Sequence, residues 1–132
     1  MGYTHHWYRE KELPQALWDK FISDVNYFVT GSNDTLVRDR DSDLPPVVDE
    51  HEVRFNGIGK QGHETFLISR VVQGGLMRDG KYFSFCKTAH KPYDRYVVEV
   101  LSLAELCFGD RIEISSDGDW ESIKVRCEYK KV

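Results

Sequence analysis

The stretch Phe83-Ser84-Phe85-Cys86-Lys87-Thr88-Ala89-His90-Lys91-Pro92-Tyr93-Asp94 joins an aromatic, strand-like segment to a long apolar helix, and it decides the fold. A strand is predicted from Tyr82 to Cys86, and the helix is predicted to begin near Pro92 and to end at Gly109. Apolar side chains recur along the helix at three- and four-residue intervals: Tyr93, Val97, Val100, Leu101, Ala104, Cys107 and Phe108. Further apolar residues widen this stripe over most of the circumference, so we expect the helix to lie largely buried across a sheet.

The junction between this strand and this helix carries cationic, hydroxyl and carboxylate groups where a plain turn of glycine, asparagine and serine would suffice. Free backbone N–H groups at the start of a helix also favour a bound anion. The junction is therefore the leading candidate for a binding site, and Lys87, Thr88 and Lys91 are the residues expected to meet phosphate groups.

A second amphipathic helix is predicted near the N-terminus, where Pro14 occupies a preferred first-turn position. Its apolar face is formed by Leu17, Trp18, Phe21, Ile22, Val25, Phe28 and Val29. A short strand from Tyr3 to Arg9 precedes this helix, and an acidic, proline-bearing surface loop from Asn33 to Asp49 follows it.

Four more strands are predicted along the chain. They are Val53 to Ile58, Thr65 to Val72, Arg111 to Ser115, and a final strand in which Ile123, Val125, Cys127 and Tyr129 alternate with charged residues. We therefore expect one α+β domain over residues 1–132, a mostly antiparallel sheet with two main helices packed on one face. The helix after Pro92 should be the more deeply buried, with Leu101 and Ala104 in the core.

Composition and charge argue against several classes of protein. The net charge of −4 disfavours broad, sequence-independent nucleic-acid binding, which needs a basic surface. No apolar run is long enough to span a bilayer, and no signal peptide is recognised, so we expect a cytoplasmic protein without a membrane partner. Cys86, Cys107 and Cys127 are widely spaced and expected to be reduced thiols, the last two as core packing.

Residues typical of binding sites concentrate in three segments, 3–9, 55–66 and 86–94. Their cations, hydroxyl and amide groups and aromatic rings suit a planar, phosphorylated ligand. The predicted ligand-binding residues are Tyr3, His5, Trp7, Asn56, His63, Glu64, Lys87, Thr88, Lys91, Tyr93 and Asp94. Among them Tyr3, Trp7 or Tyr93 would stack on a base, and Asn56 and His63 would orient it. We expect the three segments to border one concavity; alternatively, each segment only caps or solubilises its own element.

Neither a metal site nor a cofactor is expected. The 5 histidines show no H-x-x-x-H or H-E-x-x-H spacing. The acidic run from Asp39 to Glu50 matches several positions of a calcium loop, but Leu44 stands where that loop needs glycine. We interpret this run as a solvated loop.

Catalysis is weakly indicated, and no catalytic residue is assigned. Cys86 near His90, or His63 beside Glu64, would provide a nucleophile–base or acid–base pair. No nucleophile elbow, phosphate loop or dinucleotide fingerprint is present. The residues therefore favour binding over catalysis.

Four motifs of the chain resemble those of a family of small uncharacterised proteins found mainly in bacteriophages and prophages. They lie at Gly2 to Trp7, Phe55 to Gly57, His63 to Phe66 and Phe85 to Asp94, and the similarity extends through Ser115-Ser116-Asp117-Gly118. The family pattern ends in a helical tail, whereas the alternation after Ile123 favours a strand. The resemblance implies a phage-linked accessory protein, often one that counters bacterial defences.

Three hypotheses for function follow. The first is a phage-type accessory protein that binds and sequesters a nucleotide-like anionic small molecule in the cytoplasm of a bacterial host, in a counter-defence role. The second is a small hydrolase or transferase that uses His63, Glu64 or Cys86. The third is a protein-binding inhibitor of a host defence factor, with the acidic loop from Asp34 to Glu52 as a decoy surface for a basic partner.

Overall fold

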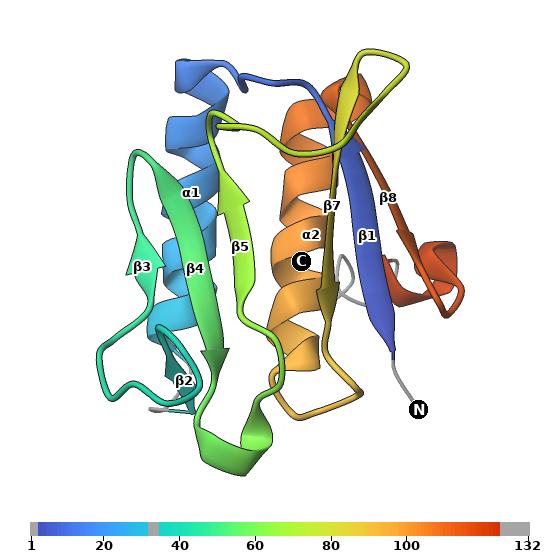
Figure 1. Ribbon diagram of the computed structural model, residues 1–132. Coiled ribbons are helices and arrows are strands. Elements are labelled where there is room, and N and C mark those ends of the chain that lie inside the picture. Colours follow the sequence, from blue (N-terminus) through green and yellow to red (C-terminus); the bar gives the residue numbers. More distant parts are fainter. Residues whose placement is uncertain (1–2, 32–34, 125–132) are drawn as a thin grey trace.

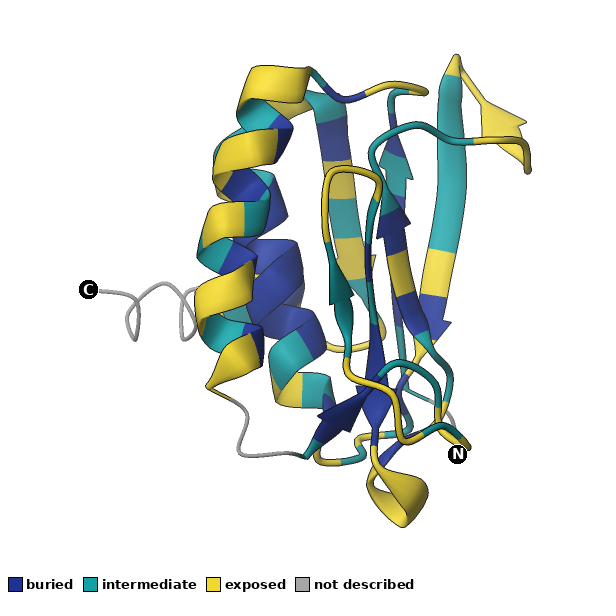
Figure 2. Ribbon diagram, turned by 90° about the vertical axis from the view of Figure 1, so that its left-hand side faces the viewer, coloured by how far each residue is buried: buried dark blue, intermediate teal, exposed yellow. Residues whose placement is uncertain are grey.

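The structure, a computed structural model, describes residues 3–31 and 35–124, and it has one layer of strands and one layer of helices (Figure 1). The helices are α1 (Gln15–Thr30) and α2 (Asp94–Phe108). They lie side by side on the same face of the strands, and the other face is left uncovered (Figure 2). The expected α+β architecture, with two main helices packed on antiparallel strands, is confirmed.

The strands form two antiparallel sheets. The first has the order β6-β7-β1-β8 and consists of β6 (Met77–Arg78), β7 (Lys81–Lys87), β1 (Thr4–Arg9) and β8 (Ile112–Ser116). In the second, β4 (Glu52–Gly57) pairs with β2 (Leu36–Val37) and β3 (Val47–Val48), and with β5 (Phe66–Ser69). Strand β1 therefore lies between β7 and β8, which brings the N-terminal segment beside both.

Buried Arg9 joins the two sheets at the end of β1. Its guanidinium donates hydrogen bonds to two carbonyl oxygens. One belongs to Ser69, the last residue of β5, and the other belongs to Arg70. Burial lowers the pKa of Arg9 to about 10, and the carbonyl partners replace the water that this charge has lost. Arg9 therefore has a structural role.

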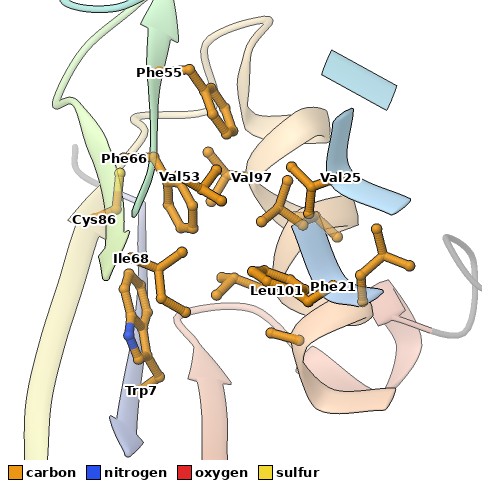
Figure 3. Close-up of a cluster of buried hydrophobic side chains, with 14 of the residues drawn as sticks. Trp7, Phe21, Val25, Val53, Phe55, Phe66, Ile68, Cys86, Val97 and Leu101 are labelled. Atoms are coloured by element: carbon orange, nitrogen blue, oxygen red, sulfur yellow. The ribbon is translucent and has the colours of Figure 1, made fainter. Parts of the chain in front are cut away.

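The core lies between the helices and the strands. Figure 3 shows Leu101 of α2 in one cluster with Phe21 of α1 and with Ile68 of β5. Leu101 and Ala104 are both fully buried, as expected. Buried positions surround most of α2, whereas α1 buries only Trp18, Phe21, Val25 and Val29. The broad apolar stripe of α2 thus correctly predicts the more deeply buried helix.

The sequence misses two local features. The loop predicted from Asn33 to Asp49 contains the two short strands β2 and β3, because Leu36–Val37 and Val47–Val48 pair with the edge of β4. The final strand is wrong where it is described: residues 120–124 are helical, and the Ile123 N–H donates to the Asp119 carbonyl at 3.1 Å. Buried Trp120, whose Nε1 donates to Glu105, anchors this turn. Val125, Cys127 and Tyr129 lie outside the described residues.

Neither α1 nor α2 is long and apolar enough to cross a membrane, and the other described segments contain no such helix.

Candidate functional site

A cluster of polar side chains lies where β1 begins, β7 and β8 end and α2 begins, all at one end of the molecule (Figure 1). We call it the His5 cluster, and it consists of Tyr3, His5, Thr88, Asp94 and Ser116. The antiparallel register brings these residues together, because His5 lies opposite Cys86 of β7 on one side and opposite Ser116 of β8 on the other. Segments far apart in the sequence thereby meet around one imidazole ring.

The His5 ring has a hydrogen-bond partner at each nitrogen. Its Nε2 lies 2.6 Å from Oδ1 of Asp94, and its Nδ1 lies 2.5 Å from Oγ of Ser116. The Thr88 hydroxyl donates to the same Asp94 oxygen at 2.5 Å. The His5 side chain is fully buried, whereas the Asp94 side chain keeps 21% of its exposure. The four side chains form one continuous chain of hydrogen bonds, from Ser116 at the end of β8 to Thr88 before α2.

The charge of Asp94 fixes which nitrogen of a neutral His5 ring carries the hydrogen. Burial opposes ionisation of Asp94, but the hydrogen bonds from His5 and Thr88 outweigh burial, so the pKa of this carboxyl is lowered. An ionised carboxylate only accepts hydrogen bonds, so His5 Nε2 must carry a hydrogen. In a neutral ring Nδ1 is then a free base and accepts the hydrogen of the Ser116 hydroxyl.

The lowered pKa predicts how acid acts on the fold. Because the pKa of Asp94 is lower in the folded than in the unfolded chain, its carboxylate stabilises the fold above the unfolded pKa of about 3.9. This stabilisation is lost as the pH falls through the folded pKa. Asp94→Asn should therefore make the fall in unfolding free energy below about pH 4 shallower than in the wild type. Urea denaturation at a series of pH values measures this, and identical slopes for both proteins would contradict it.

The loop between β7 and α2 is anchored on Tyr3 and has an unusual backbone. The N–H groups of Thr88 and Ala89 both donate to the Tyr3 carbonyl oxygen, and the His90 ring stacks on the Tyr3 ring at 3.7 Å. Ala89 and His90 have φ angles of +53° and +57°, in the left-handed region. That region costs about 1 kcal/mol or more for a residue with a Cβ atom, and such strain is concentrated at functional sites. The loop is held in this conformation by its surroundings.

Asn56, predicted to orient a ligand, instead holds the loop after β4. It is buried, and its Nδ2 donates to the His63 carbonyl and to the Thr65 hydroxyl, both at 3.1 Å. Its Oδ1 accepts from the N–H groups of Gly57 and His63. Every hydrogen-bonding group of the amide is therefore used within the loop, which corrects the predicted ligand contact.

The two glycines of this loop are required by close packing. A Cβ atom at Gly57 would lie 2.3 Å from the carbonyl oxygen of Gln61. A Cβ atom at Gly62 would lie 2.3 Å from Oδ1 of Asn56. Both positions therefore need glycine for lack of space, and the segment from Phe55 to Thr65 is closely packed against itself.

Glu64 connects this loop to the end of β7. Its N–H donates to the Lys87 carbonyl, and its Oε1 accepts from the Lys87 N–H at 2.8 Å. The buried Tyr93 hydroxyl donates to the Glu64 carbonyl. The second predicted segment is therefore joined to the third by backbone and side-chain contacts.

Cys86 is not a plausible nucleophile. It is fully buried, and burial raises the pKa of its thiol to about 12, so the reactive thiolate is suppressed. Its Sγ lies 3.6 Å from the Glu64 carbonyl oxygen and 3.9 Å from the Tyr93 hydroxyl. His90, the base that the sequence suggested for Cys86, stacks on Tyr3.

The structure places the predicted residues on two faces of the strands instead of around one concavity. His5 and Cys86 are buried on the face that the helices cover, whereas Lys87 alternates to the other face, where its Nζ lies 6.0 Å from the centre of the Phe85 ring. A cavity of about 750 Å³ lies elsewhere, between the end of α1 and strands β2 and β3, and none of the predicted ligand-binding residues lines it.

The remaining predicted residues divide between core and surface. Trp7 and Tyr93 are both buried with about 1% exposure, so their predicted stacking on a base is corrected: Trp7 packs against Phe66. His63 is exposed, and Lys91 is half-buried. The first residue of α2 is Asp94, whose negative charge opposes an anion at the helix start itself and so reduces the expected contribution of the helix N-terminus to phosphate binding.

Ser116 is the residue of the cluster that the sequence did not single out. It is the last residue of β8 and lies in the Ser115-Ser116-Asp117-Gly118 stretch that forms part of the family resemblance. A turn after a strand is a common place for serine, so spacing alone gave it no chemical role. Its position opposite His5 comes from the pairing of the first strand with the last, which is a long-range contact.

The described residues contain no group of three or more histidine, cysteine, aspartate or glutamate side chains placed to hold a metal ion. Comparisons of the chain with protein-family models, with curated proteins and with solved structures give no match.

Proposed function

We propose that this chain binds a nucleotide-like anionic small molecule at the basic loop, Lys87 to Lys91. The observation that carries the proposal is a strained, anchored loop with two lysines that pair with no carboxylate of the described residues. Ala89 and His90 hold left-handed backbone conformations, and within residues 3–31 and 35–124 no ion pair is formed by Lys87 or Lys91.

The nearby carboxylates are already engaged by other donors. Asp94 accepts from His5 and Thr88, and the Glu64 side chain accepts from the Lys87 N–H. Asp117 accepts from the Thr4 N–H at 3.0 Å. Each of these carboxylates is thus held by a donor other than a lysine side chain, and the lysine ammonium groups can bind a phosphate.

An aromatic surface adjoins these cations. The stacked Tyr3 and His90 rings lie beside the loop, and Tyr3 is only partly buried. A nucleotide would place its phosphates near Lys87 and Lys91 and its base near this pair of rings. In this proposal Tyr3 and His90 stack on the base, whereas Trp7 and Tyr93, which were also predicted to do so, are buried.

The resemblance to phage and prophage proteins supports a biological setting for this binding. An accessory protein in the cytoplasm of a bacterial host would counter a defence by removing a nucleotide signal from solution. The third hypothesis, an acidic decoy loop, receives less support: Asp39 pairs with Arg54 at 2.9 Å and accepts from Thr65, so part of its charge is used within the fold.

The proposal is tested by adding a panel of nucleotides and measuring the shift in melting temperature, followed by recovery of the ligand and its mass. A stabilising shift with at least one nucleotide is expected. No shift with any nucleotide would contradict the proposal and favour a protein partner.

Replacing both Lys87 and Lys91 by alanine should weaken nucleotide binding by about tenfold or more while the melting temperature of the free protein stays nearly constant. Unpaired surface lysines contribute little to folding, so the two effects separate. Calorimetric titration beside melting curves measures both. The matched control is the double replacement of Lys11 and Lys20, two exposed lysines outside the loop. Equal affinities for the loop variant and the control would remove the basic loop from the site.

A further inference from the structure

Two serine–histidine pairs lie next to each other between β1 and β8, and they differ in one respect. Ser116 Oγ lies 2.5 Å from His5 Nδ1, and Ser115 Oγ lies 2.6 Å from His6 Nδ1. Successive residues of a strand point to opposite faces, so the first pair faces the helices and the second faces the uncovered side. Of these two histidines, only His5 has a carboxylate of the described residues at its other nitrogen, that of Asp94.

We propose that Ser116 is a nucleophile, activated by His5 as general base, that attacks a phosphoryl centre. The choice of a phosphate ester as substrate class rests on the proposed binding of a nucleotide-like anion. The arrangement has the three roles of a serine–histidine–aspartate relay, with the two ring nitrogens exchanged relative to the usual order.

The reaction balances with these groups alone. The Ser116 Oγ–phosphorus bond forms while the hydroxyl proton moves to Nδ1 of His5. The bond from phosphorus to the leaving oxygen breaks, and that oxygen takes the proton from His5 Nδ1. Water then displaces Ser116 in the reverse sense, with His5 again accepting and returning a proton.

The remaining residues of the His5 cluster position the base. Asp94 accepts from His5 Nε2–H and would stabilise the imidazolium that forms, and Thr88 fixes the same carboxylate oxygen. The Tyr3 ring meets the His5 ring edge-on, at 5.1 Å between centres. Asp94 and Thr88 are thus positioning residues, held by the first turn of α2 and by the basic loop.

The Ser116 hydroxyl is not needed to close the end of the sheet. The N–H of Asp117 donates to the Thr4 carbonyl at 2.9 Å, and the Asp117 carboxylate accepts from the Thr4 N–H at 3.0 Å. These contacts fix the end of β8 without the serine side chain. Ser116 is only partly buried, whereas His5 is fully buried.

The test is covalent labelling of the folded protein with a neutral alkyl fluorophosphonate, followed by intact-mass measurement and peptide mapping. Attack by Ser116 releases fluoride and leaves one phosphonyl group on Oγ. We expect Ser116 to be labelled at least about 100-fold faster than Ser115, because only the base of Ser116 is oriented by a carboxylate, and losing that carboxylate from a serine–histidine–aspartate triad costs about 10⁴-fold. Ser115→Ala should be labelled like the wild type and Ser116→Ala should not. Asp94→Asn should slow labelling, with its melting curve recorded to confirm folding.

Either of two outcomes overturns the proposal. One is the absence of label from Ser116 in the folded wild type, and the other is labelling of Ser115 and Ser116 at equal rates. Protein unfolded in urea should lose the selectivity, because the relay exists only in the fold. The probe carries no charge for the lysines to bind, so this test is independent of the basic loop. Labelled Ser116 without nucleotide binding would refute the binding site alone, and nucleotide binding without label would refute the nucleophile alone.

Discussion

Replacing Leu101 by alanine should lower the free energy of unfolding by about 2–5 kcal/mol, which is the largest effect we expect from a single substitution. Leu101 is fully buried at the centre of α2, where the helix faces both α1 and the strands (Figure 3). The loss combines the transfer free energy of the removed methyl groups with the cavity left in a packed core. Urea denaturation measures it, and the m-value should stay unchanged.

The matched control for Leu101 lies on the same helix. Leu106 keeps 54% of its exposure, so Leu106→Ala removes the same atoms from a position that is largely in water. The control should change the unfolding free energy by no more than about 0.5 kcal/mol. Similar losses at both positions would show that α2 is not buried in the way described.

Asn56→Ala should cost about 3 kcal/mol of unfolding free energy. The substitution leaves the N–H groups of Gly57 and His63 and the His63 carbonyl without the partners that Asn56 provides. Each buried polar group left without a hydrogen-bond partner costs about 1–3 kcal/mol. Water that enters the loop and bonds to these groups lowers the total cost. Thermal and urea denaturation measure the loss. Asn26→Ala, on the exposed side of α1, is the control and should be close to neutral.

The outcome for Asn56 also separates its two interpretations. A ligand-orienting amide would leave the stability of the free protein nearly intact and would change affinity instead. If Asn56→Ala lowers the free energy of unfolding by less than about 1 kcal/mol, Asn56 is again a candidate ligand contact, contrary to its described role in the loop.

Local patterns predicted the elements of this fold well. The apolar stripe through Val97, Leu101 and Ala104 predicted both where α2 lies in the sequence and that it is deeply buried, because the spacing of apolar residues along a helix indicates which side faces the core. The alternation at Ile123 was too short to exclude a helix, and anchoring by Trp120, a tertiary contact, decided that turn. The short strands β2 and β3 likewise exist because β4 offers them an edge.

The candidate site was predicted only in part. The sequence marked the segments that contain His5 and Asp94 as candidate parts of a binding site, and the structure joins these two residues by a hydrogen bond. Asn56 and Trp7 were predicted to contact the ligand because the sequence does not distinguish an amide or an indole in a binding site from one in the core. Ser116 was missed because its partner lies at the other end of the chain, and only strand pairing places them together.

The measurement that tests the proposed function most directly is a titration of isotope-labelled protein with a nucleoside diphosphate, followed through the backbone amide resonances. Binding at the basic loop should shift the amides of residues 87–91 and of Tyr3, while those of α1 stay in place. Inorganic phosphate, which lacks the base, should shift the loop amides at higher concentration and leave Tyr3 less affected. Shifts confined to α1 and to the cavity beside β2 and β3, or no shift with any nucleotide, would contradict binding at the basic loop.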